Sequence, residues 1–239
     1  MSESYDAANL EAMSAAQAYP AAMLQLVLDK LALKGNLHRV ADFGAGRGDY
    51  AAGVGLATGI PVLSYEPDAS LHPFYPPGQS VTSDISTIPD ESLDAAYSLN
   101  VLEHIPDDVA ALRAWASKCK DGAYIFLLVP ANPALWTPMD TLVGHQRRYM
   151  PDTLQDAVRS AGLEVAAAGW FDRTGYFVTR AYQVLNRLKA KEPGAGVVSK
   201  TQIKLFDRVF QLSEPVLASL ALPFGKNCWV LARRPENYQ

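Results

Sequence analysis

The chain has 239 residues, of which 49% are hydrophobic and 19% charged, and its formal net charge is −4. This length suits one α/β domain with a full core and requires no second domain. No apolar run approaches the roughly 18 residues that a membrane-spanning helix needs. The first ten residues contain no basic side chain, which fits neither a signal peptide nor a transit peptide. We therefore expect a cytoplasmic protein.

The two cysteines, Cys119 and Cys228, lie far apart and belong to no CxxC or CxxH motif. This spacing indicates neither a disulfide framework nor a zinc site. We expect both to be buried thiols, and we expect no metal in the site.

The first part of the chain alternates between strands and helices. Residues 7–34 have helical spacing, with Pro20 dividing them into two helices. The segment 69–80 is rich in proline and indicates an irregular loop or a distorted short helix. The expected strands are 37–43, 62–66, 81–85, 93–99 and 123–129, and the expected helices are 49–58 and 109–120, the latter capped near Asp121 and Gly122. Such alternation predicts a doubly wound sheet that binds its ligand at the carboxyl ends of the strands.

The later part is less regular. Residues 151–161 predict a helix, 164–170 a strand, and 227–232 a final strand. Between these strands lie two amphipathic stretches, 176–191 and 201–222, and Pro215 is expected to interrupt the second. The segment 193–196 is expected to link them flexibly.

The stretch Asp42-Phe43-Gly44-Ala45-Gly46-Arg47-Gly48 follows a predicted buried strand. Its alternate glycines allow a sharp bend and close approach of the backbone to a ligand, although a purely structural turn has the same appearance. The dinucleotide fingerprint would need glycine at position 49, where this chain has Asp49.

Two carboxylates that follow later strands indicate more specifically which kind of ligand is bound. Glu66 ends the second predicted strand, where it can accept hydrogen bonds from both hydroxyls of a ribose. Asp84 follows the third strand and can accept from an adenine amino group while the Ile85 backbone approaches the ring.

With Leu93 to Ile105, these motifs resemble the class I S-adenosylmethionine-dependent methyltransferases over residues 37–130. The resemblance implies an α/β, Rossmann-like, doubly wound sheet of seven mostly parallel strands with an antiparallel last strand, which agrees with the predicted strand at 227–232. It also implies how S-adenosylmethionine is held: the methionine portion by Asp42, Gly44, Ala45, Gly46 and Gly48, the ribose by Glu66 beside Pro67, the adenine by Asp84 and Ile85, and the sulfonium above Asn100, Val101 and Leu102.

Methyl transfer to a hydroxyl requires a group that takes up the proton, and histidine suits this role near neutral pH. His104 follows the fourth predicted strand and would stand at the mouth of the cofactor cleft. The alternative is that His104 only organises the loop, because Glu-His-Ile recurs at this place in many bacterial members with different acceptors.

The segment Gly144-His145-Gln146-Arg147-Arg148-Tyr149 is similar to a GHxRRY signature found in a bacterial branch of these enzymes, of methyltransferase type 11/12. His145 is a second candidate base, and Arg147, Arg148 and Tyr149 are candidate substrate residues that can bind a carboxylate or phosphate on the acceptor. In the architectural alternative, an arginine pins carbonyl groups or Asp140, and the tyrosine packs beneath a lid. Tyr19 is either a cover over the methionine end or a core residue.

We divide the chain into N-terminal helices (1–35), a cofactor-binding core (36–170), a helical insertion (171–226) and the last strand with its tail (227–239). Residues 173–208 contain 8 basic and 2 acidic side chains. The insertion is expected to be a lid that selects the acceptor. A peripheral contact of 173–208 with the inner face of a membrane, or with a lipid-linked acceptor, is the alternative, and a homodimer formed through these helices is a third. No feature indicates a nucleic-acid partner.

The expected function is methylation of a small or lipid-linked metabolite, most plausibly at oxygen, on a phenol, quinone precursor, sugar or carboxylate, with S-adenosyl-L-homocysteine as the second product. A dinucleotide-dependent oxidoreductase is disfavoured by Asp49. A non-catalytic module that binds S-adenosylmethionine is the other alternative.

Overall fold

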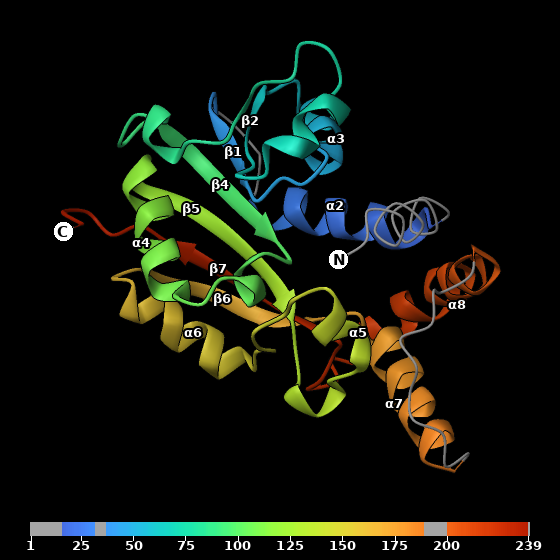
Figure 1. The fold of residues 1–239 in the computed structure, drawn as a ribbon. Helices are drawn as coiled ribbons and strands as arrows, with labels where there is room; N and C mark the ends of the chain where they lie inside the picture. Colours follow the sequence, from blue (N-terminus) through green and yellow to red (C-terminus); the bar gives the residue numbers. More distant parts are fainter. Residues whose placement is uncertain (1–15, 32–36, 189–199, 239) are drawn as a thin grey trace.

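A computed structural model describes residues 16–31, 37–188 and 200–238 (Figure 1). The expected helix before residue 16 and the expected link at 193–196 lie outside these ranges. The remaining expectations can be compared with the structure element by element.

The centre of the molecule is a seven-stranded sheet in the order β3-β2-β1-β4-β5-β7-β6 (Figure 1). Strand β7 is antiparallel to both of its neighbours, and the other pairs are parallel. The strands are β1 (Val40–Phe43), β2 (Val62–Tyr65), β3 (Val81–Thr82), β4 (Leu93–Leu99), β5 (Cys119–Pro130), β6 (Glu164–Phe171) and β7 (Asn227–Arg233). The predicted fold class, including the antiparallel last strand, is confirmed.

Helices cover both faces of this sheet, and each face has its own core cluster. One cluster includes Trp115 of α4 and Leu154 of α6, and the other includes Met23 of α2, Val54 of α3 and Phe210 of α8. Burial on both faces explains the continuous apolar run in the middle of β5. The helices are α2 (Ala18–Leu31), α3 (Asp49–Thr58), α4 (Asp108–Lys118), α5 (Pro138–Leu142), α6 (Pro151–Ser160), α7 (Arg173–Leu188) and α8 (Lys200–Ser219).

Helices α7 and α8 lie between β6 and β7 in the sequence. In Figure 1 they extend beyond the carboxyl ends of β4 and β5, which are the arrowhead ends. The carboxylate of Asp207 on α8 accepts hydrogen bonds from the backbone N–H groups of Gln17, Ala18 and Tyr19, each at 2.9 Å. These bonds satisfy free donors at the start of α2 and fix α8 against it. In the ranges that the structure describes, no helix has both the length and the apolar content to cross a membrane.

Some predicted boundaries are wrong. Residues 119–122 belong to β5 and do not cap α4, because Gly122 N–H donates to the Arg234 carbonyl and so joins the sheet. Helix α8 continues through Pro215, whose missing N–H leaves only the carbonyl of the exposed Gln211 without its helical partner. Pro20 falls in the first turn of α2, where no backbone donor is needed. Strand β3 is shorter than expected because Asp84 caps a 3-10 turn, η2 (Ile85–Thr87).

Candidate active site

The glycine loop between β1 and α3 is held by the end of β2. Gly44 N–H and Ala45 N–H both donate to the Tyr65 carbonyl, at 2.8 and 3.1 Å. Gly44, Gly46 and Gly48 all have positive φ, a conformation that disfavours other residues. The loop backbone is therefore shaped by glycine and anchored at the carboxyl edge of the sheet.

The carboxylate of Glu66 is fixed at this edge by two backbone donors. Gly46 N–H donates to Oε2 at 2.7 Å, and Asp68 N–H donates to Oε1 at 3.0 Å. The side chain is nearly covered and lines the cavity described next. Each oxygen retains a lone pair that can accept a hydrogen bond from a ligand hydroxyl.

A cavity of about 570 Å³ opens at the carboxyl edge, where the ends of β1, β2 and β4 meet the start of α4. Ile105 and Trp115 supply apolar surface suited to a flat ring. Of the residues predicted to bind the cofactor, its lining includes Gly44, Glu66, Pro67, Ile85, Asn100 and Val101. The predicted catalytic residue His104 lies on its wall as well.

Other predicted cofactor residues lie outside this lining. Asp84 is exposed, and its Oδ1 accepts from Ser86 N–H at 2.8 Å. Hydrogen bonds from the side chain and then the backbone of Ser86 lower the pKa of Asp84. Leu102 is buried in the hydrophobic core. Ala45, Gly46 and Gly48 form the loop behind Gly44 and do not line the cavity themselves.

Asp42 is buried at the end of β1, with 2% of its surface exposed. Burial raises the pKa of its carboxyl to about 8, although the adjacent Tyr97 hydroxyl opposes this shift. The carboxyl is therefore largely protonated at neutral pH in the ligand-free fold.

Tyr19 reaches the cavity through a short chain of side chains. Its hydroxyl donates to Asn227 Oδ1 at 3.3 Å, and Asn227 Nδ2 donates to Asn100 Oδ1 at 3.0 Å. The Tyr19 ring packs against Phe171, Phe206 and Phe210. Asn227 was not predicted as a site residue. The sequence did contain an indication of this role. Asn227 is the first residue of the predicted last strand, and an antiparallel last strand begins at the ligand-binding edge of the sheet.

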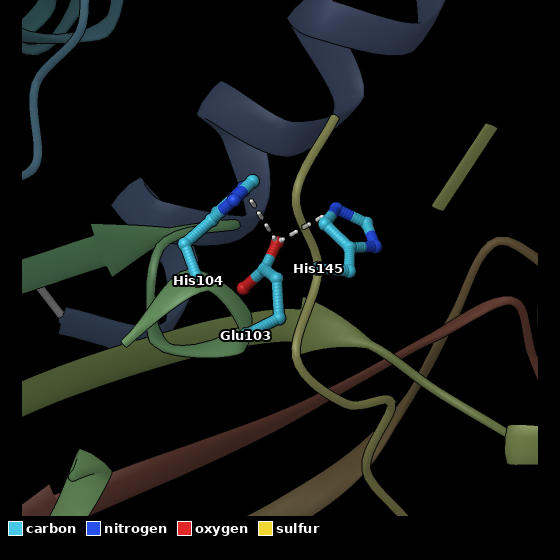
Figure 2. Close-up of side chains that lie close together, drawn as sticks. All are labelled: Glu103, His104 and His145. Carbon is cyan, nitrogen blue, oxygen red and sulfur yellow. Dashed lines mark ion pairs between the residues drawn. The ribbon is translucent and has the colours of Figure 1, made fainter. Parts of the chain in front are cut away.

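Both predicted catalytic histidines lie beside Glu103 (Figure 2). His104 comes from the 3-10 turn η3 (Leu102–His104), and His145 comes from the loop after α5. Their rings meet edge to face at 4.8 Å between centroids. Burial lowers the pKa of His104, and the neighbouring His145 adds to this shift. Glu103 is completely buried, and burial raises its pKa to about 8.

His145 is held by Asp140. Its Nδ1 lies 2.8 Å from Asp140 Oδ1, which also accepts from Arg148 Nε at 2.8 Å. Burial alone would raise the pKa of Asp140, but the hydrogen bonds from His145 and Arg148 outweigh it and hold that pKa well below its ordinary value. Because Asp140 is ionised, its Oδ1 accepts the hydrogen on Nδ1 of His145, and Nε2 of the same ring faces Glu103 Oε1 at 3.8 Å.

The contacts of the two arginines and the tyrosine match the architectural alternative. Arg148 donates to the Ala131 carbonyl as well as to Asp140, and Arg147 donates to the Pro106 carbonyl at 2.7 Å. Tyr149 is buried, and its hydroxyl donates to Asp108 Oδ2 at 2.6 Å. These groups fold the loop back over η3, where Gln146 N–H donates to the Glu103 carbonyl.

A cavity at the carboxyl edge, a glycine loop and a carboxylate after β2 define a nucleotide-binding α/β enzyme of the methyltransferase type. The family model described as a methyltransferase domain matches residues 13–168. The chain therefore belongs to the methyltransferase domain family and is an enzyme. The comparison with curated proteins found no match.

Solved structures show the same fold. A S-adenosylmethionine-dependent methyltransferase from Archaeoglobus fulgidus is 18% identical, with 89% of this chain and 92% of that chain covered and a TM-score of 0.58. The geranyl diphosphate C-methyltransferase from Streptomyces coelicolor A3(2), solved with Mg²⁺, geranyl diphosphate and S-adenosyl-L-homocysteine, is 12% identical, with 90% and 79% covered and a TM-score of 0.60. The [4+2]-cyclase SpnF is 18% identical, with 89% and 80% covered and a TM-score of 0.60. At these identities the likeness concerns the fold.

Proposed function

We propose that this enzyme transfers the methyl group of S-adenosylmethionine to a hydroxyl oxygen of a small or lipid-linked metabolite. The observation that carries the proposal is the cavity at the carboxyl edge, which has Glu66 on one wall and His104 on another. S-adenosylmethionine is the methyl donor, with its ribose on Glu66, its adenine against Ile85 and its methionine end at the glycine loop. The GHxRRY loop supports membership of the bacterial branch that the sequence resembles.

The reaction is a direct displacement at a sulfonium, so catalysis consists largely of alignment and exclusion of water. The acceptor oxygen attacks the methyl carbon, the C–O bond forms as the C–S bond breaks, and the electron pair stays on sulfur. The cluster of Glu103, His104 and His145 assists the loss of the hydroxyl proton (Figure 2). The position of His104 on the cavity wall supports an acceptor placed between this cluster and the methyl group.

Calorimetry and product release test this function together. We expect S-adenosylmethionine to bind and NADH not to bind. Glu66→Ala should weaken cofactor binding by about 1–3 kcal/mol, because charge-assisted hydrogen bonds to the ribose are lost. His145→Ala should retain cofactor affinity but release S-adenosylhomocysteine more slowly with a panel of phenols, sugars and quinone precursors.

Glu66→Gln is the matched control, since it keeps the shape of the side chain and one acceptor oxygen but removes the charge. It should weaken cofactor binding less than Glu66→Ala does. Binding of NADH in place of S-adenosylmethionine would overturn the proposal. Cofactor binding without S-adenosylhomocysteine release on any acceptor would favour a non-catalytic module.

We further propose that α7 and α8 contact a lipid surface or a lipid-linked acceptor. Helix α8 has an exposed apolar stripe at helical spacing, and Lys204 and Arg208 lie beside it. Helix α7 adds exposed apolar side chains that include Phe177 and Leu185. The stripe on α8 consists of Leu205, Val209, Leu212 and Val216, and the exposed Leu220 directly follows the helix. Apolar side chains flanked by basic ones are typical of helices that lie on anionic membranes.

Vesicle flotation tests this surface. The protein should float with anionic vesicles and not with zwitterionic ones, and the double variant Leu205→Glu/Leu212→Glu should lose this binding. Leu56→Glu is the matched control, because Leu56 is an exposed leucine on α3 that should not affect flotation. No flotation of the wild type would reject the lipid contact. If the same double variant converts a dimer into a monomer in light scattering, the stripe is a homodimer interface instead.

A further inference from the structure

Three potential metal ligands come together in Figure 2, and one of them, His104, lines the cavity. Glu103 Oε1 lies 4.0 Å from His104 Nε2 and 3.8 Å from His145 Nε2. The ligand atoms of the three side chains all lie within 4.8 Å of one another. A tetrahedral ion with bonds of about 2.0–2.2 Å places its ligand atoms roughly 3.4 Å apart. Small inward movements would therefore let all three bind one ion.

The side chain of Glu103 is the part of this cluster that a bound cation would stabilise most. It is completely buried, and within the described residues no donor forms a hydrogen bond with either of its oxygens. A buried carboxylate without a partner is costly, and such groups are normally paired with a cation or bound to a metal. The nearest ring nitrogen of His145, Nε2, lies 3.8 Å from Glu103 Oε1, while Nδ1 of the same ring is occupied by Asp140. A cation between Oε1 and Nε2 would bind both atoms and displace the carboxyl proton that burial favours.

The surroundings of His145 have the form that supports metal ligands in proteins. Asp140 orients the ring through Nδ1, and Asp140 is itself held by Thr137 N–H at 2.8 Å, Thr137 Oγ1 at 2.9 Å and Arg148. A carboxylate behind a histidine fixes the tautomer and raises the basicity of the nitrogen that faces the metal.

We propose that Glu103, His104 and His145 bind one divalent ion of the zinc type. Two imidazole nitrogens and one carboxylate oxygen suit Zn²⁺ and similar transition metals better than Mg²⁺, which prefers oxygen ligands. Three protein ligands leave at least one position open, as in catalytic zinc sites. Since His104 lines the cavity, that position faces the space where the acceptor would lie.

The chemical role of the ion rests on the proposed function. An acceptor hydroxyl bound to the ion loses its proton to solvent more easily, because the positive charge lowers its pKa. The resulting oxygen anion attacks the methyl carbon, the C–S bond breaks, and S-adenosylhomocysteine leaves as a neutral thioether. The two histidines then act as ligands and not as bases.

Metal binding can be measured without turnover. Protein treated with EDTA and dialysed is titrated with ZnCl₂ by calorimetry, and we expect one ion per chain. Glu103→Gln and His145→Ala should each weaken binding by at least about 100-fold, and Asp140→Asn by about 10- to 100-fold. His38→Ala is the matched control and should bind as the wild type does, because His38 is exposed and lies elsewhere. His104→Ala serves if Glu103→Gln fails to fold, since His104 is partly exposed.

Absence of zinc binding at millimolar concentrations would overturn the proposal, as would binding that all the ligand variants leave unchanged. A parallel titration with S-adenosylmethionine in EDTA separates the two proposals. If the cofactor binds and methyl transfer continues at full rate without metal, the metal proposal fails and the methyltransferase function stands. If zinc binds but S-adenosylmethionine does not, the proposed function fails and the metal site stands.

Discussion

Replacing Asp42 by Asn is expected to stabilise the fold at neutral pH and to weaken cofactor binding. In the unfolded chain Asp42 is ionised above pH 4, whereas in the fold burial raises its pKa to about 8. The folded protein therefore binds one proton more than the unfolded chain at pH 7. This difference costs about 4 kcal/mol of stability at pH 7, which the neutral amide avoids. The same substitution replaces the carboxyl group that is expected to hold the methionine portion of the cofactor, so cofactor binding should weaken.

The stability of the wild type should fall with rising pH, and that of Asp42→Asn should not. Because the folded-state pKa of Asp42 is raised, the stability of the wild type falls as pH rises toward about 8 and is constant above it. Between about pH 4 and pH 8, the gap in unfolding free energy between Asp42→Asn and wild type should widen by about 1.4 kcal/mol for each unit by which the pH rises. Urea unfolding at several pH values measures it. A gap that does not vary with pH would mean that Asp42 is ionised in the fold.

Gly44→Ala is expected to destabilise the protein by about 3 kcal/mol or more and to abolish cofactor binding. A Cβ at this position would lie 2.5 Å from Val101 Cγ2, and the residue has a φ of +78°. Both Gly44 and Val101 line the cavity, so any movement that relieves the clash also changes its wall. Chemical unfolding and calorimetry with S-adenosylhomocysteine measure the two effects.

Gly46→Ala is the matched control within the same loop. Gly46 also has positive φ, but a Cβ there would meet no atom within 4 Å. Its cost should be limited to backbone strain of about 1–2 kcal/mol. Equal losses for the two variants would show that strain, and not the close approach to Val101, makes glycine necessary at position 44.

Local patterns were sufficient to predict most of the sheet. Strand β4 and helix α3 have the predicted limits, because each is bounded by turn residues and has a continuous apolar pattern. The boundary between α4 and β5 could not be predicted in this way. The segment 119–122 looks like a helix cap, but its backbone pairs with the chain around Arg234, far away in the sequence. Long-range pairing overrides local turn signals at this boundary.

The candidate site was predicted in its residue types but not in all of its contacts. The histidines were recognised because imidazole chemistry is visible in a sequence. Glu103 received no role although it lies next to His104, because burial of its carboxylate arises only when the loop of Gln146 folds back over η3. Asn227 stands at the start of the antiparallel last strand, which indicated the ligand-binding edge, but its contact with Asn100, directly after β4, joins residues far apart in the chain and was not predicted.

The place where α7 and α8 enter the fold affects how this enzyme can change during evolution. Phe171 and Asn227, which border the insertion, are directly paired between β6 and β7. Within the described residues, the two helices lie in an enlarged hairpin connection that adds no strand to the sheet. Their length and sequence can therefore diverge while the strand order stays fixed and the glycine loop keeps its shape. If these helices contact the acceptor, as we propose, exchanging this turn alone would change the acceptor and leave the donor site unchanged.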